Sequence, residues 1–276
     1  MSSVPTSELS EAAVVGFFER DASNWQSLYG RTDDVFAVIH QLRHQIALTW
    51  IRDLGLPPGA RAVEVGCGAG LASVDMARLG LSVRAVDSTE AMVALAGVNV
   101  RAAGLSHLVE TGIANAHHLD DPTASADLLV ALGVLPWLRD PEEGLAEMAR
   151  VLRPGGWLVA NVDNRRRLNV LLDPLYTPAL APLRRVLRRR SKAAPDEVPD
   201  TIKHTPAEYL RMLARHGLEP VRASGFGFGP FTLLGRRVLP GRRGVQGHRA
   251  LQWLADRRVP GLTATGAQYL VLARKA

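Results

Sequence analysis

The sequence contains a single cysteine and no long apolar run. With Cys67 alone, no disulfide can form within the chain, and a reducing compartment is expected. No uninterrupted apolar stretch reaches the ~18 residues that a membrane-spanning helix needs. The first ten residues are polar and lack the basic and apolar regions of a secretory signal peptide. We therefore expect a cytoplasmic globular protein, neither secreted nor integral to a membrane.

Lysine is also scarce, although the chain is basic overall. Its 33 basic residues include only three lysines, and 27 acidic residues leave a formal net charge of +6. Apolar residues make up 47% of the 276 residues, which is typical of a soluble protein. This length is enough for one large domain that carries a substantial cap. We attach no function to the arginine bias by itself.

A glycine-rich turn near residue 66 is the most informative feature of the sequence. The buried strand expected at 61–65 is followed directly by Gly66, Gly68 and Gly70, and then by a helix expected at 71–79. Glycine lets a backbone come close to a ligand because no Cβ intervenes. The following helix would present free N–H groups to that ligand. The segment therefore predicts a small-molecule site at the end of the first strand.

Two details of this turn separate the possible ligands. Its spacing is G-x-G-x-G, whereas the binders of nicotinamide and flavin dinucleotides use G-x-G-x-x-G/A. The carboxylate of Glu64 stands two residues before the first glycine, where it would repel a diphosphate and attract an ammonium group. The pattern resembles the first motif of the class I S-adenosylmethionine-dependent methyltransferases that act on small molecules. The core is similar to the methyltransferase-11 family.

The expected order of strands and helices along the chain agrees with that resemblance. Strands are expected at 61–65, 82–86, 108–113, 127–132, 157–162, 219–226 and 267–273, and helices at 10–20, 33–54, 71–79, 89–103, 140–152 and 205–216. Such alternation favours an α/β, Rossmann-like fold, with a seven-stranded, mostly parallel sheet, helices on both faces and an inserted lid. We expect a helical cap at 1–59, a cofactor-binding core at 60–163, a lid insertion at 164–204 and a final part at 205–276. That final part carries a second insertion at about 227–266.

Further motifs match the family in order and spacing. Asp87 ends the second strand, where the family's acidic residue holds the ribose hydroxyls; the alternative is a helix N-cap. Asn115 stands where the family commonly has aspartate, and with Ala116 it is expected to contact adenine. The segment Arg150–Gly156 resembles the family's connection from helix to strand five. These matches span about residues 61–162.

The resemblance implies S-adenosyl-L-methionine as cofactor, S-adenosyl-L-homocysteine as product and no metal. Arg43 could pair with the cofactor carboxylate, or could be a solvated helix arginine. The expected cofactor contacts come from the turn, the strand ends and the N-terminal cap, and they are Tyr29, Arg43, Glu64, Gly66, Cys67, Gly68, Asp87, Ser88, Met92, Asn115, Ala116 and Leu132.

The acceptor side carries a weaker signal. Pro136 and Trp137 follow strand four and are expected to face the acceptor, together with Asn164 and Arg167 from the lid. Related enzymes often carry histidine in the loop after strand four, and this chain has none there, so a base must come from elsewhere or be unnecessary.

Histidines elsewhere are the candidate bases, and we select His44 and His204. His40 and His44 share a helix face at i, i+4. A metal pair is conceivable from that spacing, but no third ligand is evident, and a polar helix face is the simpler interpretation.

Both insertions mix arginine runs with apolar residues. The first contains Arg165–Arg167, Arg184–Arg185 and Arg188–Arg190, and the second contains Arg236–Arg237 and Arg242–Arg243. Such segments can lie on an anionic membrane, cover a lipid-like or acidic substrate, or form a solvated lid. An apolar pocket with a basic rim fits a hydrophobic small molecule, with or without an acidic group.

Three functions follow from these observations. The leading hypothesis is O-methylation of a hydrophobic small molecule in natural-product metabolism. The alternative is C- or O-methylation of a prenyl quinone or lipid at a membrane surface, and a third possibility is a cofactor-binding protein without catalysis. No nucleic-acid partner is expected, because Ala131–Val134 stands where enzymes that methylate amino groups of DNA bases carry Asn-Pro-Pro-Tyr-type motifs.

Overall fold

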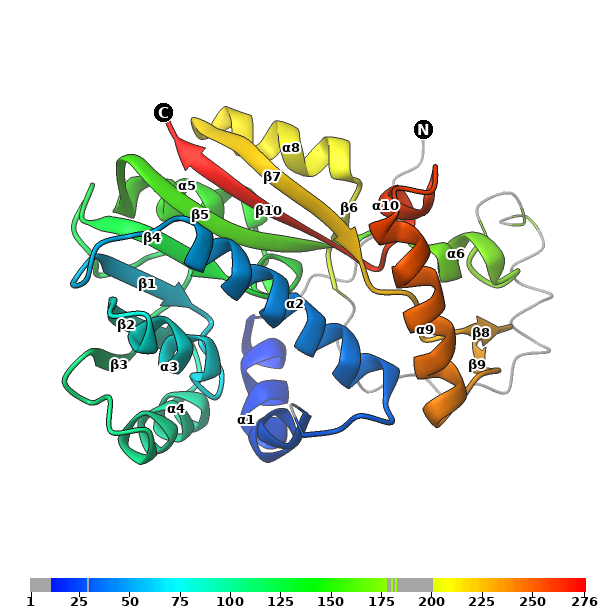
Figure 1. Ribbon diagram of the computed structural model, residues 1–276, viewed down its shortest axis with the longest axis horizontal. Coiled ribbons are helices and arrows are strands. Elements are labelled where there is room, and N and C mark those ends of the chain that lie inside the picture. Colours follow the sequence, from blue (N-terminus) through cyan, green and yellow to red (C-terminus); the bar gives the residue numbers. More distant parts are fainter. Residues whose placement is uncertain (1–10, 29, 178–179, 181, 183–200) are drawn as a thin grey trace.

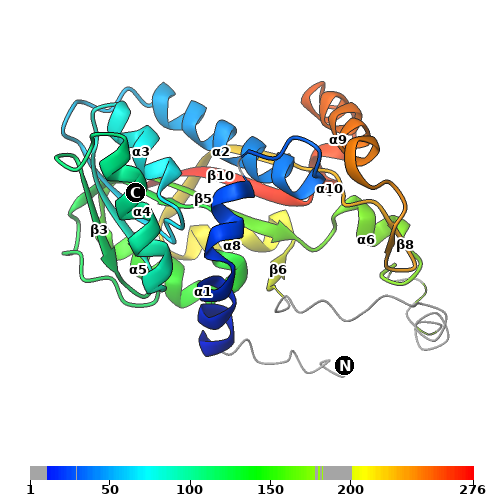
Figure 2. The same cartoon turned by 90° about the horizontal axis from the view of Figure 1, so that it is seen from below.

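The computed structural model describes residues 11–28, 30–177, 180, 182 and 201–276, with side chains from 11–20 and from residue 30 onward within those ranges. Helices cover both faces of one central sheet (Figure 1). In the view of Figure 2, α2 and α9 lie above the sheet, and α5 and α8 lie below it. The helical and strand elements in order are α1 (Glu11–Leu28), α2 (Val35–Asp53), β1 (Arg61–Val65), α3 (Leu71–Arg78), β2 (Ser82–Asp87), α4 (Glu90–Ala102), β3 (Val109–Ile113), β4 (Ala126–Ala131), η1 (Leu135–Trp137), α5 (Pro141–Val151), β5 (Leu152–Asn164), α6 (Leu168–Leu172), β6 (Lys203–His204), α8 (Pro206–Arg215), β7 (Leu218–Phe226), β8 (Thr232–Leu233), β9 (Arg236–Arg237), α9 (Gly241–Asp256), α10 (Leu262–Thr265) and β10 (Gln268–Lys275).

The main sheet has the strand order β3-β2-β1-β4-β5-β10-β7, and the short strand β6 pairs with β5. The pairs from β3 to β5 are parallel, whereas β10 runs antiparallel to both β5 and β7. This arrangement confirms the expected seven-stranded, mostly parallel main sheet with helices on both faces. The carboxyl ends of the parallel strands meet at one edge, where open sheets of this kind bind ligands.

Two apolar cores hold the layers together. One lies between the sheet and the helices α5 and α8, and includes Leu145, Met148 and Tyr209. The other lies under α2, α3 and α4, and includes Ile51 and Met76. The central strands β1 and β4 are largely buried on both faces, and apolar residues predominate in them. Burial at that density makes the strand ends rigid supports for side chains at the ligand edge.

Local sequence signals account for most helix boundaries. Asp34 caps α2 and Asp140 caps α5, each by accepting two backbone N–H bonds. Thr205 and Glu208 form a reciprocal capping box at the start of α8, with Pro206 at its first position. The helix expected at 205–216 is therefore confirmed, and its exact start follows from the cap.

The structure departs from the expected elements in three places. Strand β5 begins at Leu152 and includes Pro154–Gly156, because Leu152 already pairs with Ala126 before a register shift. The second insertion, expected at about 227–266, contains the 16-residue helix α9, which starts at Gly241. The lid insertion ends in β6, which pairs with the carboxyl end of β5, with Asn164 opposite His204.

Candidate active site

A pocket opens at the carboxyl ends of β1, β2, β4 and β5, where the glycine turn, the loops after these strands and α1 and α2 meet. Of the expected site residues, the following line it: Arg43, His44, Glu64, Gly66, Cys67, Gly68, Asp87, Ser88, Met92, Asn115, Ala116, Leu132, Pro136 and Trp137. The topology therefore gathers residues that lie far apart in the sequence. Each of their individual roles stays a prediction.

The glycine turn needs its glycines for two different reasons. Gly66 has a φ of +67°, and a Cβ there would stand 2.5 Å from Val134 Cγ2. Gly70, at the N-terminus of α3, has a φ of +74°, and a Cβ would lie 2.9 Å from the Cβ of Ala96. A Cβ at Gly68, by contrast, would have no atom within 4 Å and would face open space. A ligand can thus approach the backbone at Gly68 while its neighbours pack tightly.

Glu64 lies buried at the end of β1, behind the turn, and accepts a hydrogen bond from the Ser73 hydroxyl. Burial, with a smaller contribution from the nearby Asp87 carboxylate, raises the pKa of Glu64 to about 8 against the opposing effects of Ser73 and Arg43. The side chain is therefore largely protonated at neutral pH. A ligand ammonium group would favour its ionised form.

Asp87 is fixed by three hydrogen bonds at the end of β2. One carboxylate oxygen accepts from Gly68 N at 2.9 Å, and the other accepts from Thr89 N at 3.1 Å and Thr89 Oγ1 at 2.9 Å. The N-cap of α4 is Thr89 rather than Asp87. Burial raises the pKa of Asp87, while the bond from Gly68 opposes that shift. Its carboxylate therefore stays at the pocket edge beside the glycine turn.

The Asn115 loop is held locally by its own side chains. Asn115 Oδ1 accepts from His117 N at 2.9 Å, and Asn115 Nδ2 donates to Glu11 on α1. The amide oxygen that was expected to meet adenine therefore already has a partner. The buried Ala116 next to it also lines the pocket.

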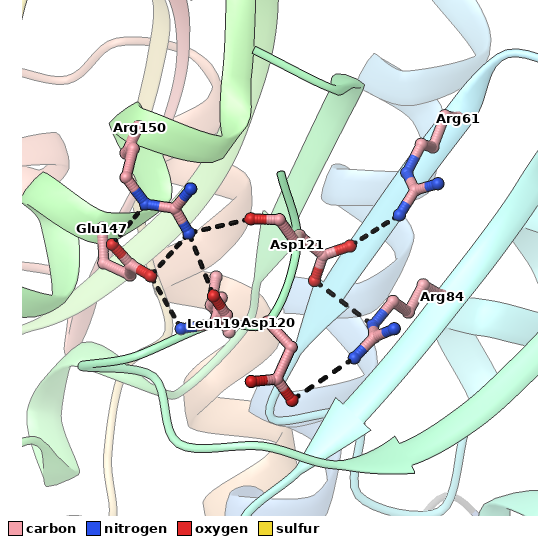
Figure 3. Close-up of polar contacts among 7 residues, drawn as sticks. All are labelled: Arg61, Arg84, Leu119, Asp120, Asp121, Glu147 and Arg150. Atoms are coloured by element: carbon pink, nitrogen blue, oxygen red, sulfur yellow. Dashed lines mark hydrogen bonds and ion pairs between the residues drawn. The ribbon is translucent and has the colours of Figure 1, made fainter. Parts of the chain in front are cut away.

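A polar cluster fixes the far end of this loop (Figure 3). The fully buried carboxylate of Asp121 pairs with Arg61 at 2.7 Å and with Arg84 at 3.2 Å. Arg150 donates to the carbonyl oxygens of Asp121 and Leu119, at 2.9 and 3.0 Å. The loop is thus tied to β1, β2 and α5 at once, which fixes its position beside the pocket.

Arg43 is the buried cation of the pocket. It projects from α2, is 6% exposed, and its Nε has no hydrogen-bond partner among the described residues. Its guanidinium lies against Gly133, where a Cβ would meet Nη1 at 2.5 Å. The solvated alternative for this arginine is therefore wrong. A buried guanidinium with an unsatisfied N–H fits a ligand carboxylate.

His40 lies one helical turn before Arg43 and is also buried. Burial, together with the Arg43 charge, lowers the pKa of His40 to about 3. Its Nδ1 lies 2.8 Å from the carbonyl oxygen of Phe36. The imidazole is therefore neutral and a poor proton acceptor. Among the described residues, no group of three or more His, Cys, Asp and Glu side chains could hold a metal ion.

The two proposed bases have different surroundings. His44 lines the pocket, but its Nε2 lies 2.8 Å from Asp75 Oδ2 on α3. His204 lies in β6 and is not among the residues that line this pocket. Burial lowers the pKa of His204, and Arg165 adds to the effect. The structure therefore does not bring the two histidines together.

The expected substrate residues divide in a similar way. Trp137 lines the pocket and stacks on Phe17 of α1, with ring centroids 5.9 Å apart. Asn164 is fully buried and donates to the carbonyl oxygens of residues 264 and 266, so its amide serves the fold. Arg167 precedes α6 outside the pocket. Tyr29, Arg184–Arg185 and Arg188–Arg190 lie outside the described residues.

Several residues that line the pocket were not predicted from the sequence. Helix α1 contributes Val14, Val15 and Phe18, although nothing in its sequence marks it as a wall of the site. Asp163 and Gln268 line the pocket from β5 and β10. Asp163 could have been selected by the rule that selected Asp87, because both are acidic residues at strand ends.

The strand order and the site define a class I methyltransferase. The fit to S-adenosylmethionine is specific: a buried arginine with an unsatisfied N–H, a carboxylate beside the glycine turn, and open space above Gly68. Residues 63–160 match the family model described as a methyltransferase domain. The chain therefore carries a class I S-adenosylmethionine-dependent methyltransferase domain.

Known proteins similar to this chain agree. Ubiquinone biosynthesis O-methyltransferase of Ruegeria pomeroyi is 29% identical over 226 residues, covering 78% of this chain and 85% of the relative. Magnesium protoporphyrin IX methyltransferase from Synechocystis, solved with bound SAH, superposes with a TM-score of 0.65 at 16% identity, covering 97% of this chain and 100% of that one. Geranyl diphosphate C-methyltransferase from Streptomyces coelicolor superposes with a TM-score of 0.56 at 19% identity, covering 88% and 82%.

Proposed function

We propose that this methyltransferase acts on a hydroxyl group of a prenylated, quinone-like ring. The observation that carries the proposal is that the residues expected to bind the cofactor and the apolar side chains of Phe36, Pro136 and Trp137 line one pocket. We call these three side chains the apolar wall. The similarity to relatives named for ubiquinone biosynthesis supports this acceptor over the natural-product acceptor that was our first expectation. The third possibility, a protein without catalysis, has no support in these relatives.

The cofactor contacts follow from the charges in the pocket. S-adenosylmethionine, when bound, supplies an electrophilic methyl group on a sulfonium. In this proposal Arg43 pairs with its carboxylate, ionised Glu64 faces its ammonium group and Asp87 accepts from its ribose hydroxyls. The backbone at Ala116 meets the adenine edge, and Met92 packs against the same ring. The remaining expected contacts are packing or backbone contacts from Gly66, Cys67, Gly68, Ser88, Asn115 and Leu132.

Alignment and exclusion of water are the protein's main contributions to a direct displacement. Helix α1 covers the pocket mouth with Val14 and Phe18, and its Glu19 accepts from the first N–H groups of α4, at 2.8 Å from Glu90 N. The thiol of Cys67 also lines the site, and burial raises its pKa, so it stays protonated and does not compete for the methyl group.

The proposal is tested by methyl transfer and by binding. Purified protein should transfer a tritiated methyl group to prenylcatechol more efficiently than to catechol, because the apolar wall binds the prenyl chain. Equal rates on both, with intact cofactor binding, would favour a small polar acceptor. No transfer to either would remove the proposed acceptor class.

Replacement of Arg43 tests the cofactor assignment. Arg43→Gln should weaken S-adenosylhomocysteine binding by roughly 10- to 100-fold, the value of one charged hydrogen-bonded pair. Binding of methylthioadenosine, which lacks the carboxylate, should not change. Arg52→Gln on the same helix, at an exposed position, is the matched control. Calorimetry gives all the affinities, and equal losses for both ligands would contradict the pairing.

A further inference from the structure

Asp163 and Gln268 meet at the ligand edge of the sheet, although 105 positions separate them. Strand β5 runs parallel to β4 and carries Asp163 near its carboxyl end. Strand β10 runs the opposite way, so its first residue, Gln268, arrives at the same edge. The register pairs the two residues directly, which puts both side chains on one face of the sheet. That face is the one toward α2, because Leu270 and Val159 on it belong to the core beneath that helix.

Hydrogen bonds hold the two side chains in the pocket. Gln268 Nε2 donates to Asp163 Oδ1 at 3.3 Å, and Thr201 Oγ1 donates to Asp163 Oδ2 at 3.1 Å. Gln268 is 8% exposed, and its buried Oε1 has no hydrogen-bond partner among the described residues. A buried acceptor without a donor is costly unless a ligand supplies one. Both residues line the pocket.

The surroundings of the pair place it on the acceptor side. Ile202 N donates to the carbonyl oxygen of Pro136 at 2.8 Å, so the Thr201 segment is joined to the loop after β4. Two residues before Asp163, on the same face of β5, Asn161 accepts from Gly133 N at 2.7 Å. Gly133 is the residue against which the Arg43 guanidinium lies. The pair therefore lies between the proposed methionine end of the cofactor and the apolar wall.

The other titratable groups of the pocket have different work. The carboxylates of Glu64 and Asp87 are held at the glycine turn. The carboxylate of Glu11, on α1, accepts from Asn115, and His117 lies beside the Asn115 amide oxygen. Turned away from the acceptor, His44 faces Asp75, while His40 is neutral with a strongly lowered pKa. Asp163 is the remaining carboxylate near the acceptor wall.

We propose that Asp163 is the proton acceptor for the methylated hydroxyl, and that the unsatisfied Oε1 of Gln268 accepts a hydrogen bond from a second hydroxyl on the neighbouring ring carbon. The inference rests on the proposed function and assigns a catalytic residue to it. As the acceptor oxygen bonds to the methyl carbon, the carbon–sulfur bond breaks and its electron pair stays on sulfur. The hydroxyl proton moves to the Asp163 carboxylate. Thr201 keeps the carboxylate facing the pocket.

The experiment compares two acceptors of different acidity. Asp163→Asn should lower kcat for prenylcatechol by about 100-fold or more, the usual contribution of a general base. Its kcat for a nitro-substituted prenylcatechol, whose hydroxyl is already ionised at neutral pH, should stay within a few fold of wild type. S-adenosylhomocysteine affinity, measured by calorimetry, should not change. Gln268→Leu keeps the carboxylate and should raise KM for both acceptors.

Asp53→Asn, which removes an exposed carboxylate paired with Arg222, is the matched control and should behave as wild type. A fully active Asp163→Asn variant, or one equally impaired on both acceptors, would overturn the assignment while leaving the proposed function intact. An inactive wild type that still binds S-adenosylhomocysteine would overturn the proposed function and the assignment with it. If Asp163→Asn does not fold, unchanged KM values for both acceptors in Gln268→Leu would overturn the roles proposed for Asp163 and Gln268.

Discussion

At the residue scale, the behaviour of the pocket depends on where single carboxylates stand. Glu64 is buried behind the glycine turn and Asp87 lies at its edge, so the first is largely neutral and the second is held by three donors. Asp163 lines the same pocket from β5 and accepts from Thr201 and Gln268. Carboxylates at these three positions can therefore bind an ammonium group, bind a diol and accept a hydroxyl proton, respectively.

Glu64 should make cofactor binding depend on pH. Its folded-state pKa of about 8 lies above the ordinary 4.5, so the folded state holds the proton more tightly and the free energy of unfolding falls as pH rises between these values. A bound ammonium group lowers that pKa, so binding at neutral pH should release a proton. Calorimetry of S-adenosylhomocysteine binding in buffers of different ionisation enthalpy measures the release.

Glu64→Gln should abolish that proton release and lower the affinity by about tenfold, the cost of one charge-assisted hydrogen bond. In wild type the release should also vanish above about pH 8, where Glu64 is already ionised. A buffer-dependent enthalpy that persists in the Glu64→Gln variant would assign the proton to another group.

Some site residues could be predicted from the sequence and others could not, for a physical reason. Glu64, Asp87 and Asn115 each lie at or just after the end of a strand, so their place at the ligand edge follows from the direction of that strand. Gln268 belongs to a strand that runs the opposite way, and only the observed register brings it beside Asp163. The mistaken alternative for Arg43 arose because amphipathic spacing does not reveal that the loop after β4 covers that part of α2.

At the element scale, the Asn115 loop depends on a cluster far from the ligand. Asp121 joins the loop to β1 and β2 through Arg61 and Arg84, and Arg150 joins it to α5 (Figure 3). None of these groups lines the main pocket. The loop is thus fixed by polar contacts from three sides, and its buried Ala116 and Leu119 belong to the apolar core beneath α5.

Asp121→Asn should lower the free energy of unfolding by about 2 kcal/mol, because the charged hydrogen bond from Arg61 and the ion pair with Arg84 both weaken. It should also weaken cofactor binding, so that the Kd for S-adenosylhomocysteine rises by a larger factor than kcat falls. Asp120→Asn is the matched control, since Asp120 is 67% exposed and 3.8 Å from Arg84, and should change stability by less than about 0.5 kcal/mol. Urea unfolding and calorimetry measure both variants, and equal effects in the two would contradict a role for the buried carboxylate.

Element boundaries were predicted well where capping residues mark them. Thr205 with Glu208 and Asp140 with Pro141 define the starts of α8 and α5 within a residue. The length of β5 was not predicted, because pairing with β4 begins before the Pro-Gly-Gly turn that suggested a break. The short β6 depends on a partner strand and leaves no periodic signal in the sequence.

At the scale of the whole molecule, exposed apolar residues gather at one end. We call them the insert patch, and its members on α6, the segment after it and the β8–β9 region are Leu171, Leu172, Tyr176, Leu233, Val238 and Leu239. Asp173 accepts from the N–H groups of Leu234 and Gly235, which joins α6 to the β8–β9 turn. Figures 1 and 2 both show α6, β8 and α9 at this end.

Arginines at 236, 237, 242 and 243 are exposed beside the insert patch. No helix in the described part of the chain is both long and apolar enough to cross a membrane. An apolar patch with basic neighbours can instead lie on an anionic surface, where each arginine contributes about 1 kcal/mol. A lipid-like acceptor would then reach the enzyme from the bilayer.

Arg236→Ser/Arg237→Ser should therefore reduce co-sedimentation with phosphatidylglycerol vesicles by roughly tenfold or more. Binding to phosphatidylcholine vesicles should be weak for every variant. Arg101→Ser/Arg211→Ser, with the same charge change away from the patch, is the control. Identical sedimentation of the two double variants would mean that only net charge matters.

The position of β10 has a consequence for how the protein is made. β10 lies between β5 and β7 although it follows both in the chain, so it must enter a gap between two strands that are synthesised earlier. While the ribosome is still adding β10, the nascent chain exposes two unpaired sheet edges, which invite pairing with other chains. Gln268 also joins Asp163 only when this strand docks. The proposed acceptor site should thus be among the last parts of the protein to form, and we expect newly made protein to gain methyl-transfer activity only once β10 has docked between β5 and β7.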